Sequence, residues 1–182
     1  QAISIDSISD LDKLLRDNRI FVFRLGRSSS RGETAFCGVR YPNEEALPII
    51  IDERDFLNTE IEGFIPRVSY ATLHPFFLVP KLSETSVVNL GLASGLVPHA
   101  LGIEGEISIP ATGKSTYTFE FRPLRGADTV LTHRDGQVEI DALFTGRRDG
   151  RDALFLLEAK KSKTLSSLSN HKLVYPYLAI KP

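Results

Sequence analysis

The sequence is poor in sulfur: among its 182 residues there is one cysteine, Cys37, and no methionine. A lone cysteine excludes a disulfide framework within the chain and a cysteine zinc cluster. No apolar run approaches the roughly 20 residues that cross a membrane as a helix. The first ten residues also lack the basic start and apolar stretch of a secretory signal. We therefore expect a cytoplasmic location and no membrane partner, and the missing methionine suggests a fragment of a longer product.

An excess of charge of one sign is also lacking. The 22 Lys and Arg residues nearly balance the 23 Asp and Glu residues, for a net charge of −1. The chain as a whole therefore does not attract nucleic acid, and any binding surface must come from local clustering. Its 42% hydrophobic and 25% charged content is ordinary for a globular protein. The length allows one core or two small lobes.

The most informative segment that is present runs from Gln137 to Lys161. On the first arm Val138, Ile140, Ala142 and Phe144 alternate with Gln137, Glu139, Asp141 and Leu143. On the second arm Ala153, Phe155, Leu157 and Ala159 alternate with Leu154, Leu156, Glu158 and Lys160, and the two patterns predict two strands with distinct faces. Asp149-Gly150 lies midway between them, and Asp-Gly is a favoured pair for a two-residue hairpin turn. The segment therefore predicts a β-hairpin.

The register of this hairpin brings acidic side chains together. Centring the turn on the Asp-Gly pair places Asp141 opposite Glu158 and Glu139 opposite Lys160, all on one face. Like charges directly opposed across an antiparallel pair are destabilising, so two facing carboxylates favour a bound cation. An oxygen-rich site of this kind suits Mg²⁺ or Mn²⁺. A bulge near Gly146 would instead shift the pairing by one residue.

The rest of the chain predicts a mixed α/β protein. A division near Pro80 is expected to separate an N-terminal mixed α/β lobe, residues 1–80, from a core of residues 81–182. Residues 52–80 have no sustained period and predict mostly irregular structure. The expected helices span Ser7 to Asp17, Ser83 to about Leu101 and Leu165 to Tyr175, and the further strands span Ile20 to Leu25, Thr34 to Tyr41, Leu47 to Ile51, Ser115 to Pro123 and Tyr177 to Ile180.

Residues 83–180 resemble the PD-(D/E)xK nuclease superfamily. The resemblance lies in the order helix, strand, strand with a central Asp, strand ending in Glu-x-Lys, and helix. Asp141 in EID and Glu158-Ala159-Lys160 in LEAK match its motif. Ile140 replaces the family's usual proline, and the sequence stops as the further strand that commonly follows the last helix would begin. The resemblance implies a restriction-endonuclease-like fold, a mixed central sheet flanked by helices, with a core that is incomplete at its C-terminus.

The resemblance also implies roles for these residues. Asp141 and Glu158 would hold Mg²⁺, for which Mn²⁺ could substitute, and the carbonyl of Ala159 would add a ligand. A divalent ion lowers the pKa of bound water and acts as a Lewis acid on the phosphoryl group. Lys160 would orient or deprotonate the attacking water, or neutralise developing charge. Glu139 is the nearest extra carboxylate for a second ion.

Other positions have a functional and an ordinary interpretation. Glu84 begins the helix before the sheet, where related nucleases often place a metal ligand, but an acid there also stabilises the helix N-terminus. Basic residues of the N-terminal loop and of the last helix could touch nucleic acid, or could be ordinary surface residues: Arg27, Arg31, Lys161, His171 and Lys172.

The function that this pattern predicts is a metal-dependent DNA endonuclease of the restriction or defence type. DNA is the expected partner, and the N-terminal lobe would help to hold it. Such enzymes often dimerise to cut both strands, so the resemblance also implies a homodimer. Two alternatives stay open: a nucleic-acid-binding module of the same fold without cleavage, and a structural or protein-interaction domain whose hairpin charges are solvated.

Overall fold

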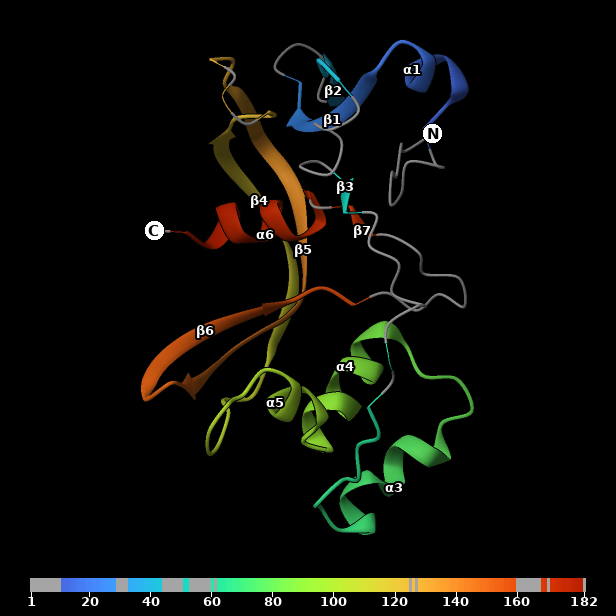
Figure 1. Ribbon diagram of the computed structural model, residues 1–182, viewed down its shortest axis with the longest axis vertical. Helices are drawn as coiled ribbons and strands as arrows, with labels where there is room; N and C mark the ends of the chain where they lie inside the picture. Colours follow the sequence, from blue (N-terminus) through green and yellow to red (C-terminus); the bar gives the residue numbers. More distant parts are fainter. Residues whose placement is uncertain are drawn as a thin grey trace. The chain divides into compact units, whose positions relative to one another are not determined.

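The computed structural model describes residues 11–28, 33–43, 51–52, 60, 62–124, 126, 128–159, 168–169 and 171–181. Helices and strands come in blocks along this part of the chain: α1, then β1 to β3, then α3 to α5, then β4 to β7, and last α6 (Figure 1). The helices are α1 (Lys13–Asp17), α3 (Tyr70–Leu78), α4 (Glu84–Ala93), α5 (Leu96–Ala100) and α6 (His171–Ile180). The strands are β1 (Ile20–Arg27), β2 (Thr34–Arg40), β3 (Ile51–Asp52), β4 (Ala111–Phe121), β5 (Leu131–Arg148), β6 (Arg151–Leu157) and β7 (Leu168–Ser169).

Five of the strands form one mixed sheet. Its order is β2-β1-β5-β4, and β6 pairs with β5 off this path. β1 is antiparallel to β2, whereas Gly26 of β1 and Arg134 of β5 form a parallel pair. β5 and β6 are antiparallel, and β3 and β7 form a separate two-stranded sheet. The mixed sheet with helices that the sequence predicts is therefore confirmed at this level. No helix within the described residues has the length and apolar character of a membrane span.

The chain divides into two compact units. The first unit comprises residues 1–59, 114–139 and 164–182, and the second comprises residues 60–113 and 140–163. These units do not follow the expected division into residues 1–80 and 81–182. The reason is that β4 and β5 each contribute residues to both units, so a single boundary along the chain cannot separate them.

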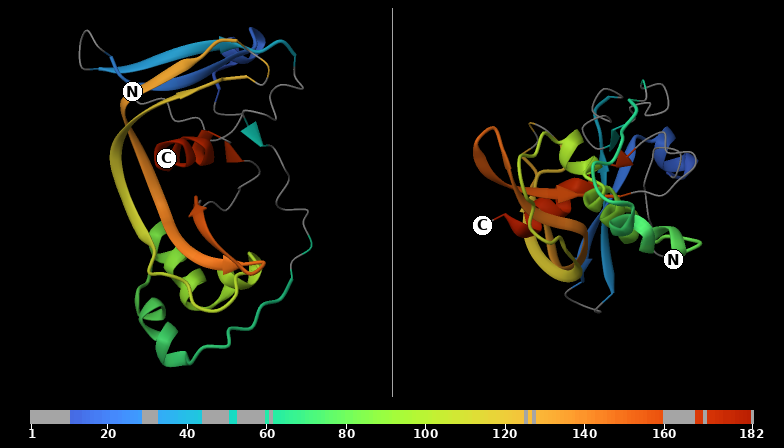
Figure 2. Two further views of the ribbon diagram at one scale, coloured as in Figure 1. Left: turned by 90° about the vertical axis from the view of Figure 1, so that its left-hand side faces the viewer. Right: turned by 90° about the horizontal axis from the view of Figure 1, so that it is seen from below.

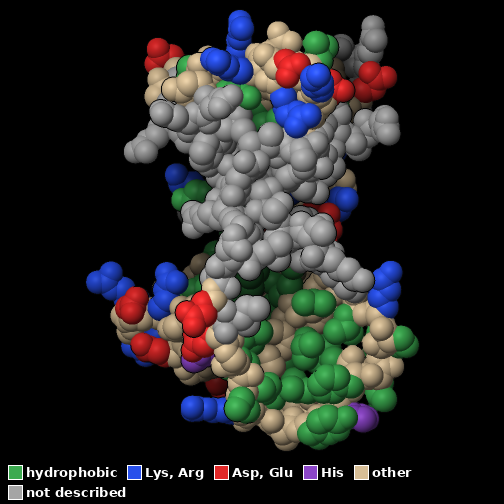
Figure 3. All heavy atoms as spheres, turned by 45° about the vertical axis from the view of Figure 1, so that its right-hand side comes forward, with side chains coloured by type: hydrophobic (Ala, Val, Ile, Leu, Met, Phe, Trp, Pro, Cys, Tyr) green, Lys and Arg blue, Asp and Glu red, His purple; other side chains and the backbone are tan. Residues whose placement is uncertain are grey.

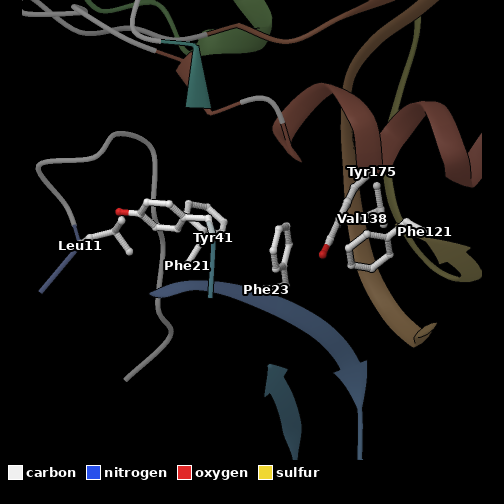
Figure 4. Packing of buried hydrophobic residues seen from close by; sticks show 7 residues of the cluster. All are labelled: Leu11, Phe21, Phe23, Tyr41, Phe121, Val138 and Tyr175. Atoms are coloured by element: carbon white, nitrogen blue, oxygen red, sulfur yellow. The ribbon is translucent and has the colours of Figure 1, made fainter. Parts of the chain in front are cut away.

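The core of the first unit is aromatic. On β1, alternation buries Phe21 and Phe23, which are 0% and 5% exposed. Figure 4 shows Phe21 beside Tyr41, and Phe23 between Phe21 and the side chains of Tyr175 in α6, Phe121 in β4 and Val138 in β5. Phe121 and Tyr175 have ring centroids 5.3 Å apart. This cluster gathers side chains from both halves of the sequence into one unit.

A buried histidine lies at the edge of this core. His133 of β5 is 0% exposed and stacks on Phe119, with ring centroids 4.7 Å apart. Its Nδ1 lies 3.1 Å from the backbone oxygen of Arg24, and because a carbonyl only accepts, Nδ1 carries the proton. Asp135, at φ +42, interrupts the alternation of β5, so that His133 and Gly136 are both buried.

The core of the second unit lies on one face of the β5–β6 hairpin. Val88 and Leu92 of α4 pack with Ala142, Phe144 and Phe155, and the last two rings stack 5.4 Å apart. Helix α4 begins where Ser83 accepts a hydrogen bond from the backbone N–H of Ser86, as the sequence predicts for a Ser83 cap. Figure 3 shows many hydrophobic side chains on the surface of the part of the molecule that holds this unit.

Several helix boundaries differ from the prediction. Helix α1 begins at Lys13 with Asp12 as its N-cap, so Leu11 and Asp12, which were expected to be helical, precede the helix. The expected start at Ser7 lies outside the described residues. The helix expected from Ser83 to Leu101 ends at Ala93, and α5 follows after Gly95, which has φ +81. In the region expected to be irregular, Ser69 caps the helix α3.

The end of the chain also differs. The last helix was expected to end at Tyr175, but α6 continues through Pro176 to Ile180, so the strand expected at residues 177–180 is helical. Leu168 and Ser169, expected in that helix, form β7. The strand expected from Leu47 lies outside the described residues except for Ile51.

Candidate metal and catalytic site

The hairpin that carries the candidate site has the predicted register. Its turn is Asp149-Gly150, with φ values of +53 and +71, as a type I′ turn requires. The pairing runs without a shift from Arg148↔Arg151 to Ala142↔Leu157. Figure 2 shows this hairpin in orange. The bulge considered near Gly146 is therefore excluded, because Gly146 pairs with Ala153. The pairing ends there, and Asp141 and Glu158 are the next residues along the two arms of the hairpin.

Asp141 lies on the hairpin face that α4 does not cover. Its neighbours on β5, Ile140 and Ala142, are buried, whereas Asp141 itself is half-buried. The odd-numbered residues of β5 therefore form the second face, which we call the site face. Leu154 of β6 lies on this face and is 57% exposed. The site face is thus accessible within the second unit as far as its described residues show.

One oxygen of Asp141 binds the backbone of the opposite strand. The N–H of Ala159 donates to Oδ2 of Asp141 over 2.7 Å. Strand β6 ends at Leu157, so this bond replaces the ladder pairing that would otherwise continue. A hydrogen bond to a carboxylate is stronger than one between neutral groups. It holds Glu158 and Ala159, both half-buried, beside Asp141.

The donor set beside Asp141 is made of oxygens. Asp141 Oδ1, the Glu158 carboxylate and the Ala159 carbonyl are hard ligands of the type that Mg²⁺ and Mn²⁺ prefer. Mg²⁺ commonly uses only one or two protein carboxylates and keeps several waters. The chemistry of these groups therefore fits such an ion. No group of three His, Cys, Asp or Glu side chains able to hold a metal ion occurs among the residues that the structure describes.

The two additional acids expected at the site do not complete such a group. Glu139 belongs to the first unit, where its carboxylate lies 3.9 Å from Lys114 Nζ and its side chain is 67% exposed. Glu84 is the acidic residue in the first turn of α4, one turn before Val88. Since Val88 packs on the opposite face of the hairpin from Asp141, the position of Glu84 supports its role at the helix N-terminus.

The remaining candidate residues are placed less closely. Lys160, Lys161 and Arg31 lie outside the described residues, and for His171 only its place at the start of α6 is described. Arg27 ends β1 and is exposed, and Lys172 is half-buried on α6. Both belong to the first unit, whereas Asp141 belongs to the second.

Sequence reasoning missed the part played by backbone groups. The N–H of Ala159 binds Asp141, and no sequence pattern indicates such a contact because every residue but proline has this group. Backbone groups of residues 104–108 also pair with β5. Here the N–H groups of Glu104 and Ser108 donate to the carbonyls of Arg147 and Thr145 over 2.7 and 2.9 Å.

Comparison with known proteins places the chain in a family. Residues 57–181 match the family model described as a domain of unknown function, DUF6997. The chain belongs to the DUF6997 family. No curated protein and no solved structure gives a significant match. The DUF6997 match includes α3, α4, α5, the whole β5–β6 hairpin and α6. The candidate site therefore lies within the part of the chain that defines the family, but its chemistry must be argued from its residues.

Proposed function

We propose that this DUF6997 chain is a metal-dependent nuclease of the restriction or defence type that hydrolyses phosphodiester bonds in DNA. The observation that supports the proposal is the register of the β5–β6 hairpin, in which Asp141 and Glu158 directly follow the last pair, Ala142↔Leu157. The order α4, α5, β4, β5, β6, α6 supports a restriction-endonuclease-like core, although β7 interrupts it before α6.

The proposal gives the residues of the site the following roles in binding the ion and in hydrolysis. Asp141 and Glu158 hold Mg²⁺, with the Ala159 carbonyl as a further ligand. The bound ion supplies Lewis acidity and a water of lowered pKa. Lys160 follows Ala159 directly and is proposed to orient the attacking water. The bond from the Ala159 N–H positions the Asp141 carboxylate before any ion binds, so less conformational entropy is lost on binding.

A nucleic-acid-binding module without cleavage is the second candidate. The hydrogen bond from Ala159 to Asp141 favours this candidate, because it gives Asp141 a structural role that needs no ion. In that role Asp141 accepts the N–H of Ala159, just after the end of β6. The described residues also hold no group of three potential ligands. A surface that binds DNA with no Mg²⁺ dependence would fit this candidate.

Plasmid nicking in Mg²⁺ or Mn²⁺ separates the two. Asp141→Asn keeps an oxygen that accepts the Ala159 N–H but removes the charge, so the variant should fold normally. We expect it to lower the nicking rate by about 100-fold or more, the scale on which one acid–base or charge-stabilising group acts. Glu158→Gln should act similarly. Asp128→Asn removes an equal charge from an exposed position of the first unit and should leave the rate unchanged.

Asp141→Ala tests the structural role. It removes the acceptor as well as the charge and should cost about 1–2 kcal/mol of stability in urea unfolding, the usual penalty for a donor left unpaired. Nicking by Asp141→Asn and Glu158→Gln at the wild-type rate would refute the nuclease proposal. DNA binding without nicking in either metal would establish the second candidate.

A further inference from the structure

Three arginines surround the turn of the β5–β6 hairpin. Arg147 and Arg148 end β5, and Arg151 begins β6, which places the group at the tip of the orange hairpin in Figure 1. We call Arg147, Arg148 and Arg151 the tip arginines. All three are exposed, and none of them forms an ion pair with a residue that the structure describes. The two tip aspartates, Asp149 and Asp152, are also exposed and unpaired within that part of the chain.

The register opposes two of these charges directly. Arg148 pairs with Arg151 beside the turn, and like charges in that position are destabilising. A bound anion would remove this repulsion, and the planar guanidinium group recognises phosphate in a bidentate manner. The Arg148–Arg151 pair is therefore more stable with an anion bound than without one.

Local contacts also restrain the tip. The Arg148 guanidinium lies over the Phe155 ring, 5.4 Å from its centroid. Arg147 Nη2 donates to the Gly150 carbonyl over 3.2 Å, and the backbone oxygen of Arg147 accepts from Glu104. Because the first two contacts restrain the guanidinium groups of Arg148 and Arg147 before binding, less conformational entropy is lost when a ligand orders them.

The tip lies on the same hairpin as the candidate site but apart from it. Arg147 is on the site face, six residues beyond Asp141 along β5, whereas the Arg148–Arg151 pair belongs to the opposite face, where Arg148 lies over Phe155. At about 3.4 Å per residue the separation is about 20 Å. Leu143 and Thr145 occupy the site face between them, so no charge on β5 joins the two positions. A DNA duplex covers that distance in about six base pairs.

We propose that the tip arginines bind the phosphate backbone of nucleic acid about 20 Å from the bond that is cut. This inference rests on the proposed function, because it takes nucleic acid as the substrate. It gives the hairpin a second role, in which one end holds the reacting phosphate and the other end fixes the direction in which the duplex leaves the site.

The test is fluorescence anisotropy with a labelled 30-base-pair duplex, in EDTA, at several salt concentrations. Each phosphate contact contributes about 0.9 to the slope of log affinity against log salt, so Arg148→Gln/Arg151→Gln should lower that slope by about 1.8. Arg148→Lys/Arg151→Lys keeps both charges and should retain most of the slope. Arg67→Gln/Lys81→Gln changes the charge equally at exposed positions of the same unit and should leave the slope unchanged.

Each result decides. An unchanged slope in the folded Gln variant, an equal loss in the Arg67/Lys81 control, or no duplex binding by the wild type overturns the inference. Nicking that depends on Asp141 but not on the tip arginines would overturn the inference and leave the nuclease proposal standing. Binding that depends on the tip arginines, with no nicking in any metal, would overturn the nuclease proposal and leave phosphate binding by the tip arginines standing.

Discussion

Asp141 shows how a single residue can have both a structural and a chemical role. Its Oδ2 accepts the Ala159 N–H, and this bond marks the end of β6. Its other oxygen and the facing Glu158 form the proposed metal site. A neutral amide would serve the first role as well as a carboxylate does. The second role requires the negative charge, which is why Asn and Ala at this position are expected to behave differently.

At the residue scale, Tyr175 is the other side chain with an unusual environment. Its hydroxyl donates to the Arg24 carbonyl over 3.0 Å, so this carbonyl accepts from both Tyr175 and His133. Burial raises the pKa of Tyr175 far above its usual value, although the nearby Arg24 charge partly opposes the rise. The hydroxyl of Tyr175 therefore stays protonated in the folded protein at pH values where an exposed tyrosine ionises.

This shift predicts a loss of stability in alkali. The unfolded tyrosine has a pKa of about 10, and the folded value is higher, so the stabilisation is complete below about pH 10 and is lost above it. We expect the free energy of unfolding of the wild type to fall between pH 10 and pH 11 more steeply than that of Tyr175→Phe. Urea unfolding across this range measures the difference. Equal slopes for the two proteins would contradict the assigned environment.

At the element scale, the hairpin could be predicted because its signals are local. The Asp149-Gly150 pair favours positive φ at both turn positions, and alternation then determines the faces of both strands. The same argument gave the register from Arg148↔Arg151 to Ala142↔Leu157, since pairing follows from the turn when no bulge intervenes. The two strands that lead to Asp141 and Glu158 were therefore predictable.

The helices were harder to predict because three of them contain a proline, a residue that usually ends a helix. Pro98 lies in the first turn of α5, where a backbone N–H has no partner within the helix, so it does not break the helix. Pro176 lies inside α6 but is buried, next to the buried Tyr175. Packing of these residues into the first core outweighs the lost hydrogen bond. Helix α3 also contains a proline, Pro75, and its exposed Tyr70 and Phe77 give it no clear apolar face.

The close approach of β1 and β5 predicts a strict need for glycine. A Cβ on Gly136 would meet the ring of His133 and lie 2.6 Å from the Cα of Gly26. Gly136→Ala should therefore destabilise the protein by about 3 kcal/mol, the upper range for overpacking. Gly113→Ala is the matched control, since a Cβ on that β4 residue meets nothing within 4 Å. Thermal unfolding compares the two, and similar melting temperatures would contradict this packing.

At the scale of the whole molecule, the arrangement into two units follows from long-range pairing. Local patterns predict where strands occur, but not that residues 114–139 join the N-terminal segment while residues 140–163 join α3 to α5. The aromatic core of the first unit joins β1 to α6, elements more than a hundred residues apart, as the Arg24–Tyr175 bond illustrates. No sequence period carries that information.

The proposed function requires that Asp141 and Glu158 bind one divalent ion between them. Anomalous diffraction from crystals of the full chain soaked in Mn²⁺ measures this directly. We predict one strong peak within bonding distance of a carboxylate oxygen from each residue, about 2.0–2.2 Å away, and its loss in Asp141→Asn crystals. Ordered carboxylates with no Mn²⁺ between them at saturating concentration would contradict the metal-dependent nuclease.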